Sequence, residues 1–174
     1  MCTEETCRYN HCANRAVALD DFPLCEVRQS PDQGQMLFAK EAIPAGAVIT
    51  TYRGEVIAET KRATRESVLG FGANAYTMQY KEPGSTEPLY VVNARTRGSL
   101  GRFINHACGA SANCEIEGLQ YHNRRVMTFR ASKDIEPGSV IRFNYFGADS
   151  HITGTSDNYC RERTLSYWKG CQTP

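Results

Sequence analysis

Short apolar runs separated by turn signals fill the middle of the chain, and this pattern predicts a protein built mainly of β-strands. The run MLFAKEAI (residues 36–43) is followed by PAG (44–46) and then by AVITTYRGEVIA (47–58), which is rich in β-branched residues. A Pro-x-Gly sequence between two such runs is typical of a turn between strands. The same arrangement recurs over residues 126–147, where EPG separates VMTFRASKDI from SVIRFNYFG.

Two further segments complete the predicted elements. YTMQY (76–80) and LYVVNA (89–94) predict a hairpin. TKRATRESVL (60–69) has a helical pattern, with Thr60 as its candidate N-cap. The sequence therefore predicts many short strands and few short helices, within the single compact domain expected for 174 residues.

Composition and charge narrow the classes of function. Lysine plus arginine number 20 against 19 acidic residues, and a net charge of +1 favours neither nucleic acid nor an anionic membrane as a direct partner. No apolar run approaches the roughly 20 residues that span a bilayer, and the first residues, MCTEETCRYNHC, are too polar for a secretory signal. We therefore expect an intracellular protein, in which eight cysteines favour metal ligation or free thiols over disulfides.

Two segments carry candidate chemistry. In RFINHAC (102–108), Asn105 and His106 place amide and imidazole groups side by side, which suits a polar ligand such as a nucleobase or an amino-acid head group. The alternative is a capped turn beside a core Phe103. In SVIRFNYFG, Tyr145 stands at a strand end, where its hydroxyl enters a pocket or its ring simply joins the core.

The order of the motifs is more specific than any one of them. GQMLFAKEAIPAG, YRGEV, YTM, YVVNARTRGSLGRFINHAC and EPGSVIRFNYFG follow one another, and this series resembles the SET domain of histone-lysine methyltransferases over about residues 25–147. The resemblance implies the mainly β SET fold (β-clip), with RFINH as a cofactor-facing strand and the C-terminal segment threaded into a pseudoknot-like arrangement. It divides the chain into a cysteine-rich remnant of pre-SET or AWS type (1–26), a SET domain (27–147) and a post-SET-like tail (148–174).

The resemblance also implies a site for S-adenosylmethionine and a channel for the substrate lysine. The residues that match the cofactor site are Gly34, Gln35, Met36, Tyr76, Arg102, Phe103, Asn105, His106 and Tyr145. Tyr145 matches the catalytic tyrosine beside the transferred methyl, and Tyr52 and Phe143 match walls of the channel. Free lysine has a pKa near 10.4, so only about one amine in 2,000 is neutral at pH 7. An aromatic channel and a nearby sulfonium would lower that pKa.

Phe143 carries a prediction about the product. In the family, a tyrosine at this position holds a water molecule that limits methylation to one group. Phenylalanine lacks that hydroxyl, so the resemblance implies a di- or trimethylated product.

Departures from the family pattern support an alternative function. Met36 stands where a glycine is usual, and it would be strained if that position needs a positive φ. Asn144 stands where an aspartate is usual. These departures favour a catalytically impaired SET-fold binding module as one alternative to a histone methyltransferase. The other alternative is a methyltransferase for a non-histone protein.

Cysteines near both ends suggest zinc. Cys2, Cys7 and Cys12 have the spacing C-x4-C-x4-C, which resembles the end of the cysteine-rich segment that precedes some SET domains. Cys108 matches a cysteine that joins a tail zinc site in relatives, and here the tail offers Cys160 and Cys171. The alternatives are free thiols at the first end and, at the second, a tail that packs through its aromatic residues.

The resemblance implies partners and a location as well. The expected partner is a histone tail or another lysine-containing peptide, and the expected location is the nucleus, on chromatin. We expect a monomer. The lysine that is methylated cannot be predicted from these motifs.

Overall fold

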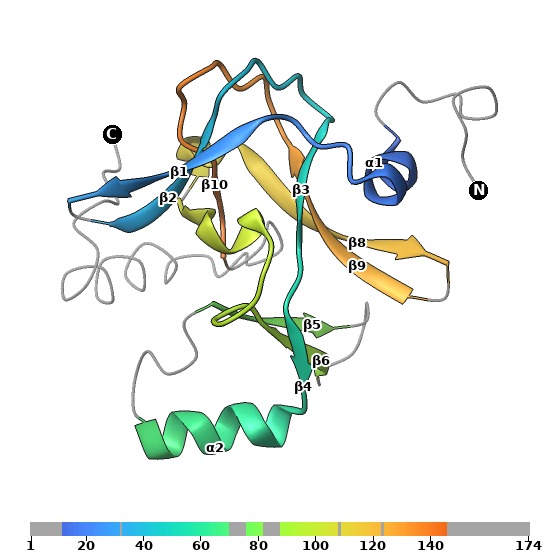
Figure 1. Ribbon diagram of the computed structural model, residues 1–174, viewed down its shortest axis with the longest axis vertical. Helices are drawn as coiled ribbons and strands as arrows, with labels where there is room; N and C mark the ends of the chain where they lie inside the picture. Colours follow the sequence, from blue (N-terminus) through green and yellow to red (C-terminus); the bar gives the residue numbers. More distant parts are fainter. Residues whose placement is uncertain are drawn as a thin grey trace.

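The computed structural model describes residues 12–31, 33–69, 76–81, 88–107, 109–122 and 124–145, and all structural statements concern these residues. Their elements, in chain order, are α1 (Ala13–Leu19), β1 (Cys25–Ser30), β2 (Gly34–Ala39), β3 (Val48–Tyr52), β4 (Glu55–Ile57), α2 (Glu59–Leu69), β5 (Thr77–Lys81), β6 (Pro88–Asn93), the 3-10 helix η1 (Leu100–Phe103), β7 (Asn105–His106), the 3-10 helix η2 (Gly109–Ser111), β8 (Cys114–Tyr121), β9 (Arg124–Ala131) and β10 (Arg142–Phe143) (Figure 1). Within the described ranges, no helix has the length and apolarity to cross a membrane.

The strands form three sheets. β1 and β2 pair as a hairpin, β4, β6 and β5 form a second sheet in that order, and β3, β9, β8, β10 and β7 form the central one. The predicted hairpin is confirmed, because β5 pairs antiparallel with β6. The helix α2 lies beside the sheet of β4, β6 and β5 at the bottom of the view, and the β1–β2 hairpin extends at the left, above it (Figure 1). The predicted mainly β architecture is therefore confirmed.

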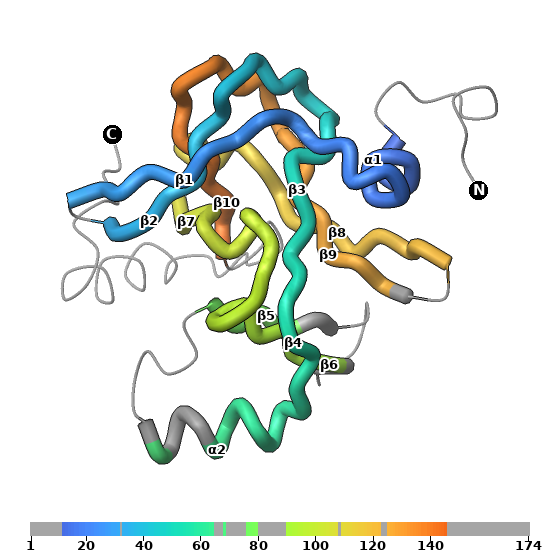
Figure 2. Tube along the Cα trace, viewed as in Figure 1, coloured from blue at the N-terminus to red at the C-terminus, as the bar shows by residue number. Residues whose placement is uncertain are grey.

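The last strand lies between two strands that precede it in the chain. β10 is parallel to β7 on one side, where Arg142 faces Asn105 and Phe143 faces His106, and parallel to β8 on the other, where Phe143 faces Cys114. Figure 2 shows this late segment running between the yellow strands of the same sheet. The arrangement agrees with the threaded C-terminal segment that the resemblance implies.

Several local expectations need correction. Helix α2 begins at Glu59, so Thr60 lies inside its first turn and is not the N-cap. The carbonyl of Thr60 instead accepts a hydrogen bond from Thr64 Oγ1 at 2.9 Å. The RFINH segment is not one strand, since a 3-10 helix over its first residues gives way to the two-residue β7. The patterns used above also missed α1, β1 and β8.

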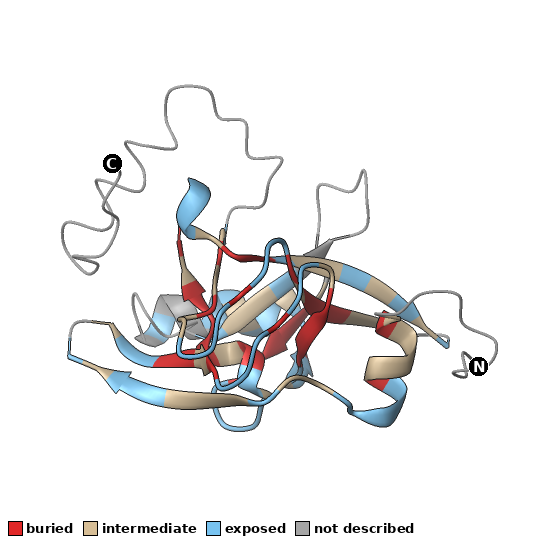
Figure 3. Cartoon of the chain, turned by 90° about the horizontal axis from the view of Figure 1, so that it is seen from above, coloured by how far each residue is buried: buried red, intermediate tan, exposed pale blue. Residues whose placement is uncertain are grey.

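The hydrophobic core lies where the central sheet meets η1. Phe129 of β9 is fully buried at its centre. Gly101 of η1 is packed so closely that an added Cβ would stand 2.5 Å from the carbonyl oxygen of Thr51 and 2.7 Å from Cε2 of Phe129. Buried segments gather in the middle of the molecule, and the hairpin ends are exposed (Figure 3). The absent side chain at Gly101 thus lets the polar segment that follows η1 sit directly on the core.

Candidate functional site

Tyr145 follows β10 and is held by the segment from Ile104 to His106. Its hydroxyl Oη donates a hydrogen bond to the carbonyl oxygen of Ile104 at 3.2 Å. Its backbone N–H donates to Nδ1 of His106 at 3.1 Å, and the two rings meet edge to face with centroids 5.2 Å apart. The strand pairing of β10 with β7 brings these groups together. Tyr145 is therefore fixed at its backbone, its ring and its hydroxyl.

The hydroxyl of Tyr145 remains protonated at neutral pH. Burial, and then the proximity of Tyr76, raise the pKa of Tyr145 to about 12. The residue as a whole is 49% exposed, but its hydroxyl is turned inward against the Ile104 carbonyl, and this inner end is the part that burial affects. Burial, and then the proximity of Tyr145, also raise the pKa of Tyr52. Both phenols are hydrogen-bond donors and not general bases under these conditions.

Three aromatic side chains form a continuous wall beneath Tyr145. Phe143 lies with its ring centroid 4.7 Å from that of Tyr145 and 4.9 Å from that of Phe129. Phe129 in turn meets Tyr52 edge to face at 6.3 Å. The structure thus joins the predicted channel residues Tyr52 and Phe143 through Phe129, which the sequence analysis missed. The signal that could have identified Phe129 was its position in the apolar run VMTFRASKDI.

The turn at the start of β2 is held by Asn105. Gly34 adopts a left-handed conformation with φ 71°, and a Cβ at that position would meet nothing within 4 Å. The amide Nδ2 of Asn105 donates to the carbonyl oxygens of Gln33 at 3.3 Å and Gln35 at 3.5 Å. Met36 is buried in β2 without a positive φ, so the strain expected there is absent. The structure brings Asn105 to the start of β2, where both amide hydrogens are used within the protein, and a shared cofactor site stays a prediction.

Arg102 lies over the ring of Phe103, and that ring meets the ring of Tyr76 edge to face. The guanidinium carbon of Arg102 lies 4.6 Å from the ring centroid of Phe103, whose ring meets that of Tyr76 at 6.4 Å. Arg102 Nη1 donates to the carbonyl oxygen of Ala94 at 2.9 Å, and within the described ranges its buried Nε has no hydrogen-bond partner. Tyr76 is 41% exposed and has a φ of 63°, a conformation that few non-glycine residues adopt. Such strain persists only where the surroundings impose it.

His106 is neutral in this arrangement. Its Nδ1 accepts the backbone N–H of Tyr145, and that nitrogen therefore carries no proton. Burial lowers the pKa of His106 below its ordinary value near 6.5. The imidazole acts as a backbone acceptor that positions Tyr145.

Comparison with known proteins identifies the fold. The family model described as "SET domain" matches residues 34–146. The chain belongs to the SET domain family. It is 33% identical to the "Probable histone-lysine N-methyltransferase set-23" of Caenorhabditis elegans, over 94% of this chain and 68% of that protein. It is 30% identical to the "Histone-lysine N-methyltransferase, H3 lysine-36 specific" of Cryptococcus neoformans and to the H3 lysine-9 specific enzyme of Schizosaccharomyces pombe, each over 92% of this chain.

A solved structure gives the same result. The SET domain resembles a chain from a humanized mutant of the Chaetomium thermophilum Polycomb Repressive Complex 2 bound to the inhibitor GSK343, with a TM-score of 0.64 and 26% identity over 77% of this chain and 16% of that one. The present chain spans 19% of the Cryptococcus relative and 33% of the Schizosaccharomyces relative. The relatives are histone-lysine methyltransferases by name, and the match confirms the predicted family and fold.

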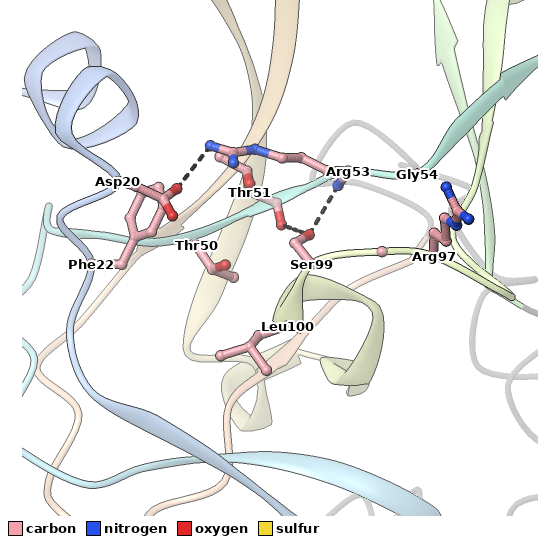
Figure 4. A pocket seen from close by; sticks show the side chains of 10 residues that line it. Asp20, Phe22, Thr50, Thr51, Arg53, Gly54, Arg97, Ser99 and Leu100 are labelled. Atoms are coloured by element: carbon pink, nitrogen blue, oxygen red, sulfur yellow. Dashed lines mark hydrogen bonds and ion pairs between the residues drawn. The ribbon is translucent and has the colours of Figure 1, made fainter.

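A depression of about 510 Å³ lies elsewhere on the SET domain, between the α1–β1 linker, the end of β3 and the start of η1. Arg53 crosses it to form an ion pair with Asp20 at 3.0 Å, and its backbone N–H donates to Ser99 Oγ at 2.9 Å (Figure 4). Ser99 Oγ donates in turn to the carbonyl oxygen of Thr51. None of the residues that the sequence assigns to cofactor or channel lines this depression.

The zinc predictions fall mostly outside the described residues. Cys2, Cys7, Cys108, Cys160 and Cys171 all lie there. Cys12 is described and forms no disulfide. Across the described ranges, no group of three histidine, cysteine or acidic side chains is arranged to hold a metal ion. Zinc at either end of the chain stays a prediction.

Proposed function

We propose that this SET domain transfers methyl groups from S-adenosylmethionine to the ε-amine of a lysine in a histone tail. The observation that carries the proposal is the hydroxyl of Tyr145. It is held by the Ile104 carbonyl at the end of an aromatic wall formed by Phe143 and Phe129. Burial in aromatic surroundings is the environment that keeps a lysine amine neutral and therefore nucleophilic.

The described residues fit S-adenosylmethionine. Asn105 donates both amide hydrogens to carbonyls of Gln33 and Gln35, and within the described residues no hydrogen bond to its Oδ1 is found, so this oxygen could accept one from an ammonium group. The Nε of Arg102 is buried and has no hydrogen-bond partner among the described residues. The exposed rings of Tyr76 and Tyr145 offer faces that attract a cation. The predicted cofactor residues would hold this group together.

When bound, S-adenosylmethionine supplies a methyl group carried on a positively charged sulfur. Tyr145 directs its hydroxyl hydrogen to the Ile104 carbonyl, so the lone pairs of Oη are free to face the amine and the polarised methyl. His106 fixes the backbone of Tyr145 and thereby the position of that oxygen. Alignment of this kind can lower a displacement barrier by several kcal/mol. The phenol remains protonated, so solvent carries away the amine proton before attack.

The proposed product is di- or trimethyllysine. Phe143 is 4% exposed, and its ring packs on Phe129 and Tyr145 without a hydroxyl of its own. The neighbouring Phe129 adds no polar atom. This part of the wall therefore offers no side-chain donor to hold a water molecule that would crowd a methylated amine.

The names of the relatives support the proposed substrate and location. Several are named for lysine 36 or lysine 9 of histone H3. We propose a histone tail as the substrate, a monomer as the active form, and chromatin in the nucleus as its location. Met36 departs from the family pattern, and this departure favoured a binding module. It no longer supports that alternative, because Met36 is unstrained in β2.

Two measurements test the proposal. Calorimetry with S-adenosylmethionine reports cofactor binding, and transfer of tritiated methyl groups to the core histones reports turnover. We expect both cofactor binding and methyl transfer, and we expect Tyr145→Phe to abolish the transfer. Cofactor binding without transfer to any lysine substrate would establish the binding module instead, and transfer only to non-histone proteins would replace the substrate.

The domain boundaries and the zinc sites form a separate part of the proposal. We expect residues 1–26 to act as a pre-SET-like segment and 148–174 to complete the lysine channel behind the SET domain of 27–147. Metal analysis of the purified chain, with Cys12→Ser and Cys108→Ser as variants, assigns any bound zinc to one end or the other.

A further inference from the structure

Arg142 of β10 is anchored by its own backbone. Its N–H donates to Oδ1 of Asn113 at 2.9 Å, and its carbonyl oxygen accepts the N–H of Asn113 at 3.0 Å. The same carbonyl accepts a hydrogen bond from Sγ of Cys114 at 3.3 Å. The side chain of Arg142 therefore projects from a fixed point in the central sheet.

The guanidinium of Arg142 reaches the turn that precedes Gly34. Its Nη2 donates to Oε1 of Gln33 at 3.2 Å, and its Nε is buried with no hydrogen-bond partner among the residues that the structure describes. Arg142 forms no ion pair with any acidic residue that the structure describes. Burying part of a cation against a neutral amide is costly. Gln33 is the one hydrogen-bond acceptor that the described residues give to the Arg142 guanidinium.

Two neighbouring strands hold the same turn. Asn105 is the ladder partner of Arg142 in the parallel pairing of β7 and β10. Asn105 binds the main chain of the turn through the carbonyls of Gln33 and Gln35, whereas Arg142 binds the side chain of Gln33. The turn is thus clamped to β7 through its backbone and to β10 through one glutamine.

We propose that Arg142 is a positioning residue that acts through Gln33 to fix residues Gln33–Met36, where the β1–β2 turn enters β2, for cofactor binding. The inference rests on the proposed function, in which this turn contacts S-adenosylmethionine. Gly34 has a left-handed φ of 71°, and glycine leaves this conformation easily because no Cβ restricts it. A bond from a fixed strand removes that freedom before the cofactor arrives, so less conformational entropy is lost on binding.

The test removes the bond from each side. Arg142→Met keeps the length of the stem and deletes the donors, and Gln33→Leu deletes the acceptor. Each variant is expected to raise the Kd for S-adenosylmethionine about tenfold, as the loss of a charge-assisted hydrogen bond would. The double variant should bind no more weakly than either single one, because both delete the same contact. Arg142→Lys retains one donor and should recover part of the affinity.

Amide hydrogen exchange without cofactor supplies a second readout. Exchange of the Gln33–Met36 amides should be faster in Arg142→Met and in Gln33→Leu, and kcat at saturating cofactor should stay within about twofold of the wild type. Arg130→Met is the matched control: it removes another strand arginine, which donates to Glu117 through Nε at 3.0 Å, and should leave both readouts unchanged. If Arg142→Met does not fold, Gln33→Leu tests the same contact from the turn.

The outcomes distinguish a failure of the proposed function from a failure of the positioning role of Arg142. A wild-type chain that does not bind S-adenosylmethionine overturns the proposed function and this role with it. A wild-type chain that binds, with Arg142→Met and Gln33→Leu binding equally well, overturns the positioning role alone. Faster exchange without weaker binding overturns it too, since the clamp would then be structural only.

Discussion

The hydroxyl of Tyr145 donates to the backbone carbonyl of Ile104, 41 positions earlier in the chain, at 3.2 Å. A carbonyl is an acceptor only, so this contact fixes the direction of the phenolic hydrogen. The lone pairs of the hydroxyl then point away from Ile104, which sets the chemistry that the residue can perform.

Removal of that hydroxyl is expected to stop catalysis while the fold remains. Tyr145→Phe should lower kcat by about 100-fold or more, comparable to the loss of one preorganised polar group at a reacting centre. The ring contacts with Phe143 and His106 should survive. Tyr121→Phe, at the end of β8, serves as the control and should retain turnover. Equal rates for both variants would refute a catalytic role for Tyr145.

A hydroxyl added at Phe143 should change the product. Phe143→Tyr places a polar group in the wall beside Tyr145, where it can hold water and crowd a methylated amine. Mass spectrometry of a peptide substrate should show a shift from di- and trimethyl product to monomethyl product. Phe38→Tyr, at a half-buried position of β2, is the control and should leave the distribution of methylated products unchanged. A wild type that makes only monomethyllysine contradicts this prediction before any variant is needed.

Acid should weaken the fold through His106. Burial lowers the pKa of His106, so the folded state binds this proton less readily than the unfolded chain does. The neutral imidazole therefore contributes to folding stability fully above the unfolded-state pKa near 6.5, and this contribution is lost as the pH falls below that value. Urea unfolding at pH 7.5 and 5.5 should show a larger loss of stability for the wild type than for His106→Asn. His122→Asn removes an exposed histidine and should follow the wild type.

The close approach at Gly101 should tolerate no side chain. Gly101→Ala would place Cβ 2.5 Å from the Thr51 carbonyl oxygen and against the ring of Phe129. We expect a loss of about 1–3 kcal/mol in the free energy of unfolding, as for other overpacked cores. Leu100→Ala in the same 3-10 helix, where the side chain is 42% exposed, is the comparison. Similar unfolding midpoints for the two variants would show that η1 moves freely.

The buried thiol of Cys114 should resist alkylation. Burial, and then the proximity of Glu115, raise the pKa of Cys114 to about 12, so almost no thiolate exists at pH 8. Mass spectrometry after treatment with iodoacetamide should show Cys114 labelled in urea but not in the native protein. Rapid labelling under native conditions would mean that the pairing of β8 with β10 opens readily.

The sequence predicted the elements whose apolar patterns are strong and local. The hairpin of β5 and β6 belongs to this group, whereas the helix over 60–69 is largely polar and was predicted from its helical pattern. Helix α1, over ANRAVAL, was missed because it is only seven residues long and has no side-chain N-cap bond. The grouping of Tyr52, Phe143 and Tyr145 came from ordered motifs and not from any local pattern. The roles of Gln33 and Arg142 could not be predicted, because 109 positions separate them in the chain.

The position of β10 has a consequence for the order in which this protein can fold. Its partners β7 and β8 come earlier in the chain, yet they do not pair with each other, because β10 lies between them. The chain must therefore be synthesised through Phe143 before the central sheet can close. Until then one edge of β8 is unpaired. Tyr145 has not yet been synthesised either, so it cannot bind the Ile104 carbonyl. Such long-range parallel pairing is intrinsically slow, so we expect the catalytic centre to be the last part of the domain to assemble.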